Sequence, residues 1–289
     1  PAVVEGTPHY LCDIRDKSAL TTAMLDIRPQ IVIHLAARTD LDERNDVNGY
    51  AANIVGVRNL AEAIRETPSV RRAVCTSSQL VGKSGELPKA DRDYCPTTLY
   101  GESKVMTEQI WRDHDGGGVT WAIVRPTTIW GPEMNPHYEK FFRMIRDGRY
   151  VHVGRADIEK SYGYVGNAVL QYMRIADAPS QDVHGRTMYV ADYEPIGLRR
   201  WADGFQQELH ARRIRTIPRW IAACAARVGD ILNTAGASAF PFNSFRLNNV
   251  LTGYTVDTSV TKAVCGPLPY TMAEGITDTV SWLRRVWDR

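Results

Sequence analysis

The residue pair with the clearest chemical meaning is Tyr100 and Lys104, in the segment YGESK at positions 100–104. Four residues make about one turn of an α-helix, so the phenol and the ammonium group would lie on one helix face. A free tyrosine has a pKa near ~10, which is too high for a base at neutral pH. A neighbouring cation favours the phenolate and lowers that pKa, so the pair is suited to taking a proton from a hydroxyl group.

A run of hydroxyl side chains, Thr76-Ser77-Ser78, precedes the pair. The hydroxyl of Ser77 would hold a substrate oxygen beside the phenol. Such a trio can move a proton between a substrate hydroxyl and the enzyme while a hydride leaves the same carbon atom. We therefore predict that Ser77, Tyr100 and Lys104 are catalytic.

The spacing of Tyr100 and Lys104 is a weak signal by itself, since a chain of this composition contains it by chance ~0.3 times. The alternative is an exposed helical turn whose lysine reaches into solvent. The surroundings favour a site: an apolar strand at 73–75 leads into the hydroxyl residues, and a second strand at 119–124 leads into polar residues. A helix carrying Tyr100 between two such strands is typical of open α/β sheets, which bind ligands at the carboxyl ends of their strands.

The periodicity of apolar residues predicts helices in eight segments: 18–26, 47–65, 96–113, 136–147, 167–176, 198–210, 218–232 and 272–287. Strands alternate with the early helices, which indicates a parallel sheet in an α/β fold. From residue 136 onward the alternation is less regular.

Several segments share their pattern with a known family. They are 12–16 (CDIRD), 31–37 (IVIHLAA), 53–60 (NIVGVRNL), 125–132 (RPTTIWGP), 160–167 (KSYGYVGN), 257–259 (DTS) and 270–283. Together with Tyr100, Lys104 and the place of Ser77 five residues before Gly82, they resemble the extended short-chain dehydrogenases/reductases, in the branch of NAD-dependent epimerases and dehydratases of nucleotide sugars. The resemblance covers almost the whole chain.

The resemblance implies a Rossmann-like doubly wound parallel sheet with a small C-terminal substrate lobe. Residues 1–135, with parts of 160–195, would form the dinucleotide-binding domain, and residues 136–160 and 196–289 mainly the lobe. It also implies NAD or NADP as cofactor. The residues that it places on the cofactor are Asp13, Ile14, Leu35, Ala36, Ala37, Asn53, Thr76, Tyr100, Lys104, Pro126 and Thr127.

One part of the family pattern is missing from the sequence: no Gly-x-x-Gly-x-x-Gly follows an opening strand. A dinucleotide site needs such a cradle of backbone N–H groups for its phosphates. We therefore expect the sequence to lack the N-terminal strand, glycine-rich turn and helix. The alternative, a diverged protein that never bound a dinucleotide, is disfavoured by Ser77, Tyr100 and Lys104. The choice between NAD and NADP stays open, because the sequence also lacks the residue that distinguishes the two cofactors at the ribose.

The substrate class follows from further comparison with the family. Dehydratases carry Asp-Glu where this chain has Ser78 and Gln79, and these two side chains cannot supply the acid and base for loss of water. We predict an NAD(P)-dependent epimerase or ketoreductase of a nucleotide sugar, with Tyr100 as acid and base. The alternatives are an oxidoreductase like the 3β-hydroxysteroid dehydrogenases, and a non-enzymatic NAD(P)-sensing regulator on the same fold.

Four residues are predicted to contact the substrate: Ser78, Thr128, Lys160 and Arg246. Thr128 stands where the family has a sugar-contacting Asn. Arg246 and Lys160 are cations suited to a diphosphate, and a guanidinium can pair with two oxygens at once. We expect Arg246 to point into the cleft that Tyr100 lines.

Net charge, the length of apolar runs and the cysteine pattern limit the classes of function that remain. The 289 residues carry a formal net charge of +2, which gives no case for binding nucleic acid. No apolar run approaches the ~18 residues of a membrane-spanning helix. The five cysteines are scattered and show no metal spacing, so we predict no metal site and reduced thiols, as in a cytoplasmic protein. We also expect a homodimer.

Residues 217–232 carry an apolar face near five arginines. Two interpretations stay open: a helix packed on the substrate lobe with its polar face in solvent, which is the more ordinary one, and a helix on a membrane surface. His34 ends a buried strand and is interpreted as structural.

Overall fold

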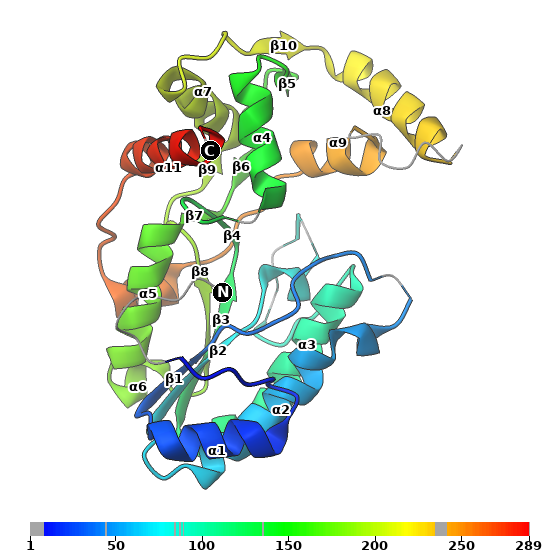
Figure 1. The fold of residues 1–289 in the computed structure, drawn as a ribbon. Coiled ribbons are helices and arrows are strands. Elements are labelled where there is room, and N and C mark those ends of the chain that lie inside the picture. The colour runs from blue at the N-terminus through cyan, green and yellow to red at the C-terminus, as the bar shows by residue number, and fades with distance from the viewer. Residues whose placement is uncertain are drawn as a thin grey trace.

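The computed structural model describes residues 9–43, 45–83, 85–86, 88, 90–134, 136–234 and 242–288. Its lower half in Figure 1 contains a four-stranded parallel sheet in the order β1-β2-β3-β8. The strands are β1 (Ile31–His34), β2 (Arg72–Thr76), β3 (Thr120–Pro126) and β8 (Arg186–Val190). The α/β class and the parallel sheet predicted from the sequence are confirmed.

Helices cover both faces of the sheet because the side chains of β2 and β3 alternate between two cores. Ala73, Cys75 and Ile123 pack into a core with helices α1 (Lys17–Ile27), α2 (Ala51–Glu66) and α3 (Leu99–Asp113). Val74, Ala122 and Val124 pack on the opposite face with α5 (Val165–Asp177), α6 (Ser180–Val183) and α10 (Ser259–Cys265). The sheet is therefore doubly wound.

A second lobe lies beyond the carboxyl ends of the strands, in the upper half of Figure 1. Helices α4 (Pro136–Arg146), α7 (Leu198–Glu208) and α11 (Met272–Trp287) surround an aromatic core. In it Trp130, Phe142, Trp201 and Phe205 pack mainly edge to face. Three small sheets complete the lobe: β4 (Thr128–Trp130) with β7 (Tyr162–Tyr164), β5 (Val151–Val153) with β10 (Arg215–Ile217), and β6 (Glu159–Lys160) with β9 (Ile196–Gly197).

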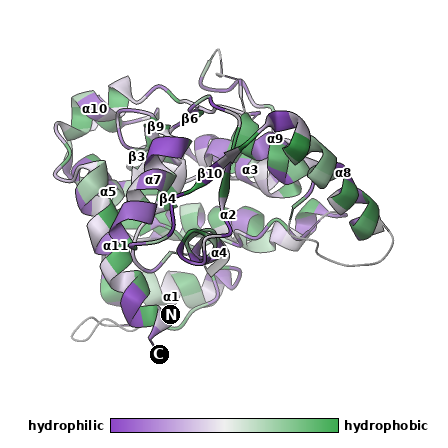
Figure 2. Cartoon of the chain, turned by 90° about the horizontal axis from the view of Figure 1, so that it is seen from above, coloured by the Kyte–Doolittle hydropathy of each residue, from purple (hydrophilic) through white to green (hydrophobic). Residues whose placement is uncertain are grey.

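Two further helices, α8 (Arg219–Thr234) and α9 (Ser244–Leu251), stand out from one side of this lobe. Figure 2 shows α8 at the edge of the molecule, with hydrophobic residues along it. All eight predicted helices are present, whereas α6, α9 and α10 were not predicted. The domain boundaries at 135, 160 and 195 remain predictions, and α10 packs on α5 from a segment assigned mainly to the lobe.

Candidate active site

The register of β2 decides which way the hydroxyl run faces. Ser77 continues the strand, since its N–H donates to the carbonyl of Val124 on β3. Side chains alternate along a strand, so Ser77 shares the face of Cys75, toward α3, and Thr76 faces α5. The Thr76 hydroxyl accordingly lies 2.9 Å from the Tyr172 hydroxyl of α5. Ser77 is thus on the side of the sheet from which Tyr100 and Lys104 approach.

The N-terminus of α3 is fixed against the turn that follows Ser77. The Thr98 side chain caps the helix by accepting a hydrogen bond from the Gly101 N–H. A Cβ atom at Gly101 would lie 2.3 Å from the Leu80 carbonyl oxygen, so only glycine allows this approach. The close contact brings the first turn of α3, which carries Tyr100, onto the carboxyl end of β2.

Lys104 crosses from α3 to the strand. Its Nζ donates to the carbonyl of Thr76 at 2.9 Å, and the residue is 2% exposed. Burial lowers the pKa of Lys104, while the nearby Cys75 and Glu108 act in the opposite direction. Tyr100, one helical turn earlier, is buried and packs at a ring-centroid distance of 5.9 Å from Tyr50. The structure therefore places the predicted tyrosine and lysine together at the end of the sheet.

Ser77 also belongs to a buried network that the sequence did not reveal. Its hydroxyl donates to Oε1 of Glu108 at 2.6 Å. The same carboxylate accepts from Arg125 Nε at 2.7 Å and Nη2 at 2.8 Å, and from the Tyr94 hydroxyl at 2.8 Å. Glu108 is fully buried and Arg125 is 2% exposed. Glu108 follows Lys104 by one helical turn and so lies on the same, inward face of α3. An acidic residue on that face was the feature of the sequence from which this network could have been predicted.

His34 lies beside this group at the end of β1. Burial, followed by the positive charge of Lys104, lowers the pKa of His34 to about 3. Within the described residues its Nε2 atom has no hydrogen-bond partner. The side chain is therefore a neutral imidazole in the core, in agreement with its structural interpretation.

Asn53, predicted to bind the cofactor, is fully buried in α2. Its Oδ1 accepts from the Arg38 N–H, and its Nδ2 donates to the Arg38 carbonyl and the Ser103 hydroxyl. These bonds tie the loop after β1 to α3. In that loop Leu35 is 62% exposed. Leu35, Ala36 and Ala37 therefore stand at the carboxyl end of β1, where the sequence placed them.

The other predicted cofactor residues form the surrounding turns. The turn at Asp13 and Ile14 is held by α2, because Asn59 Nδ2 donates to the Ile14 carbonyl. Asp13 is exposed, and a hydrogen bond from Arg15 lowers its pKa to about 2. Pro126 ends β3. Thr127 follows it, with its N–H donating to the Val190 carbonyl.

The chemistry of Lys104 fits a nicotinamide dinucleotide. An ammonium group has three hydrogens. Within the described part of the chain, Nζ donates one hydrogen bond, to the Thr76 carbonyl. A buried donor needs partners, so ribose hydroxyls of a bound cofactor are suitable acceptors for the remaining hydrogens. Leu35, which follows the carboxyl end of β1, is exposed and offers an apolar contact surface there.

The predicted substrate residues lie on both sides of the site. The Ser78 hydroxyl accepts from the Leu80 N–H, and Thr128 is half-buried in β4. Lys160 Nζ donates to the Asn249 carbonyl of α9 at 2.6 Å, and burial lowers the pKa of Lys160. Arg246, also on α9, is exposed.

A bridge connects these two sides. The backbone of Lys160 pairs with Tyr254, whose hydroxyl donates to the Gln79 carbonyl at 3.4 Å. The segment that follows α9 therefore reaches the turn next to Ser78. The orientation of Arg246 into the cleft that Tyr100 lines stays a prediction.

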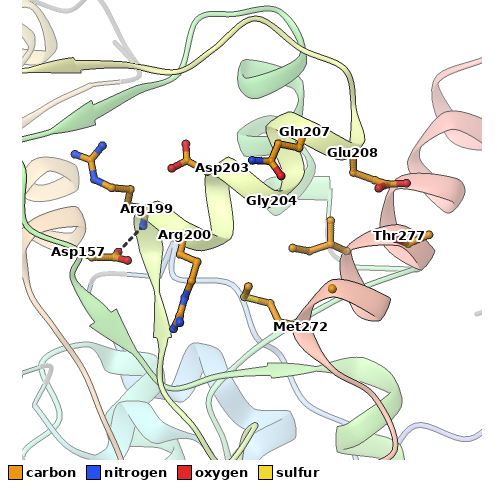
Figure 3. Close-up of a pocket in the computed structure, with 11 residues that line it drawn as sticks. Asp157, Arg199, Arg200, Asp203, Gly204, Gln207, Glu208, Met272 and Thr277 are labelled. Atoms are coloured by element: carbon orange, nitrogen blue, oxygen red, sulfur yellow. Dashed lines mark hydrogen bonds between the residues drawn. The ribbon is translucent and has the colours of Figure 1, made fainter.

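A cavity of about 500 Å³ lies elsewhere, between α7 and α11 in the upper lobe. Figure 3 shows Arg200, Asp203 and Met272 around it. Its lining contains none of the predicted site residues. The two guanidinium and three carboxylate groups in the lining give it little net charge. The cavity is therefore separate from the site around Tyr100.

The chain is similar to known proteins in sequence and in fold. In sequence, N-acetyl-α-D-glucosaminyl-diphospho-ditrans,octacis-undecaprenol 4-epimerase of Escherichia coli O157:H7 is 26% identical over 282 residues, which cover 93% of this chain and 82% of that protein. The 3β-hydroxysteroid dehydrogenase/Δ5→4-isomerase of Mycobacterium tuberculosis H37Rv is 27% identical over 176 residues, which cover 58% of this chain and 47% of that protein.

In structure, UDP-glucose 4-epimerase of Thermotoga maritima, solved with UDP-glucose, superimposes with a TM-score of 0.72 at 17% identity, covering 96% of this chain and 84% of that one. This similarity confirms the Rossmann-like fold. A family model described as the NAD dependent epimerase/dehydratase family matches residues 3–191. The predicted enzyme class and the nicotinamide cofactor agree with that match. The chain therefore belongs to the NAD dependent epimerase/dehydratase family.

Proposed function

We propose that this protein transfers a hydride between a nucleotide sugar and a nicotinamide cofactor, as an epimerase or a ketoreductase, with Tyr100 as the acid and base; the roles below are written for oxidation of a sugar hydroxyl. The observation that carries the proposal is Lys104, which is buried, lies one turn from Tyr100 and donates to the strand at Thr76. A lysine held there supplies a positive charge at a fixed place beside the phenol.

Each member of the trio has a role that its contacts support. Tyr100 takes the proton of the substrate hydroxyl, and the ammonium of Lys104 favours its phenolate form. In the structure Ser77 donates to Glu108. Because the single hydrogen of the substrate hydroxyl goes to Tyr100, Ser77 would hold the substrate oxygen by turning its own hydrogen from Glu108 to that oxygen. The cofactor, when bound, accepts the hydride. The ammonium of Lys104 would also hold the ribose of the bound cofactor.

The substrate class rests on two cations at the lobe. Lys160 is tied to α9, the helix that carries Arg246, and the segment after α9 reaches Gln79 beside the predicted site. Arg246 is exposed and can pair with two oxygens of a diphosphate. The relatives named above include enzymes of a sugar diphosphate and of UDP-glucose, which supports a glycosyl diphosphate as substrate.

The test is the exchange of Tyr100 for phenylalanine in the full-length protein. Turnover of a panel of UDP- and GDP-sugars with NAD or NADP is measured before and after the exchange. Tyr100→Phe should lower kcat by ~10²–10⁴-fold, because the proton transfer is lost. Cofactor affinity, measured by calorimetry, should change little. Retention of most of the activity in Tyr100→Phe would refute the role.

A further inference from the structure

Helix α8 buries its small residues and exposes its large ones. Ala222 and Ala226 are fully buried, and with Leu247 of α9 they form a small core. On the opposite side Trp220 is 68% and Ile231 67% exposed. A surface helix of a water-soluble domain normally does the reverse, with its large apolar side chains toward the core. The ordinary interpretation of this segment, with the apolar face packed on the lobe, is therefore wrong for α8.

The exposed apolar residues of α8 lie on one face. At about 100° per residue, they fall within a sector of roughly 120° of the helix circumference. We call this set the α8 face: Trp220, Ile221, Val228, Ile231 and Leu232. On the neighbouring helix Phe245 is 71% exposed. Large contiguous apolar surfaces of this kind mark sites of interaction with proteins or membranes.

The segment that carries the α8 face is rich in positive charge. Residues 211–251 contain six arginines and one aspartate, although the whole chain has a net charge of only +2. Asp230 is the one acidic residue of this stretch. Its carboxylate accepts hydrogen bonds from the backbone N–H and the hydroxyl of Ser244. The six arginines are exposed: Arg212, Arg213, Arg215, Arg219, Arg227 and Arg246. The combination is complementary to a surface that is both apolar and anionic.

We propose that α8 binds the surface of an anionic lipid bilayer, with the α8 face in the acyl boundary and the arginines at the headgroup phosphates. Trp at such a boundary keeps its ring among the acyl chains and its N–H in the polar layer. A helix with aromatic and aliphatic residues on one face and arginines beside them lies in the plane of the interface. None of the described helices is long and apolar enough to cross a bilayer.

A second copy of the chain is a poorer occupant of this surface. A two-fold interface brings the same patch of both subunits together. Here that would place the arginines of both subunits opposite each other. Each subunit has one aspartate in this stretch to offset their charge, and that aspartate already accepts a hydrogen bond from Ser244. Anionic headgroups instead neutralise these charges, which is worth about 1 kcal/mol, or roughly fivefold in affinity, for each cation near the surface. This inference does not rest on the proposed reaction.

The experiment is sedimentation of the full-length protein with vesicles of phosphatidylcholine, with and without phosphatidylglycerol. The parent protein should sediment with the anionic vesicles and be released by high salt. The double variant W220S/I231S should bind at least about tenfold more weakly, because it loses apolar area at the interface. The variant R227Q should bind roughly fivefold more weakly to anionic vesicles, since Arg227 borders the α8 face on the helix circumference and one cation is removed.

The matched control is V169S/M173S on α5, where two apolar residues are 53% and 56% exposed on the other lobe. It should bind vesicles like the parent. Thermal unfolding should be unchanged in all variants, because every substituted side chain is exposed. Absence of vesicle binding by the parent would overturn the proposal. So would concentration-dependent self-association that W220S/I231S alone abolishes, since a second copy would then cover the α8 face.

Discussion

Replacing Glu108 with alanine would remove the nearest carboxylate of the buried Arg125 guanidinium and leave it with Asp91, whose partly exposed carboxylate lies 3.9 Å away. Glu108 accepts two hydrogen bonds from Arg125, one from Ser77 and one from Tyr94, and the side chain itself is fully buried. Removing one partner of a buried ion pair destabilises a protein by about 3–5 kcal/mol, because the other charge stays desolvated. We expect a loss of that size in the free energy of unfolding.

The measurement is urea denaturation at neutral pH, followed by circular dichroism. Glu62→Ala is the matched control, because Glu62 pairs with Lys17 at 2.8 Å while both side chains are partly exposed. An exposed pair contributes ~0–1 kcal/mol, so the control should be nearly neutral. Glu108→Gln keeps the shape and an acceptor for Ser77 but not the charge, and it should fall between the two. A loss in Glu108→Ala no larger than in the control would refute the account of the network.

Three further predictions concern the site. Lys104→Met should raise the KM for the cofactor, and it should move the acid limb of the pH profile of kcat/KM to higher pH because the phenolate loses its cation. The control is Lys140→Met at an exposed position, and an acid limb that does not move would contradict the role of Lys104. Arg246→Ala should weaken nucleotide-sugar binding, measured by calorimetry, by about 1.5–3 kcal/mol, and unchanged affinity would argue against a diphosphate contact. For His34, burial lowers the pKa to about 3 from an unfolded value of 6.5, so its contribution to stability is complete above pH 6.5 and is lost as the pH falls toward 3. Between pH 6.5 and about 5 the parent should lose ~2 kcal/mol more stability than His34→Leu, and equal pH dependence would show that His34 is not buried as a neutral group.

The sequence predicted the long elements well because their patterns repeat over several turns. The helices at 51–66 and 272–287 each keep one apolar face for 16 residues, and both were expected. Helices α6, α9 and α10 have four, eight and seven residues, too few for a helical period to be recognised. They depend on tertiary contacts, such as the bond from Lys160 to the Asn249 carbonyl of α9.

The site was predictable where it depended on local spacing and not where it depended on packing. Tyr100 and Lys104 are one helical turn apart, so their common face followed from geometry alone. The partner of Ser77 did not follow, because Glu108 meets it only when α3 lies on β2. The exposure of Trp220 and Ile231 was missed for a similar reason: periodicity shows that a helix has an apolar face, but not which face the lobe covers.

Product analysis with nucleotide sugars tests the central claim most directly. The full-length protein and its Tyr100→Phe variant are incubated with each sugar and with NAD or NADPH, and products are followed by NMR while cofactor absorbance is recorded. We predict conversion by the parent: interconversion of two sugars without net cofactor turnover identifies an epimerase, and stoichiometric oxidation of the reduced cofactor identifies a ketoreductase. Tyr100→Phe should lose the activity by ~10²–10⁴-fold. Conversion of no nucleotide sugar by the parent, or conversion at an equal rate by Tyr100→Phe, would contradict the account.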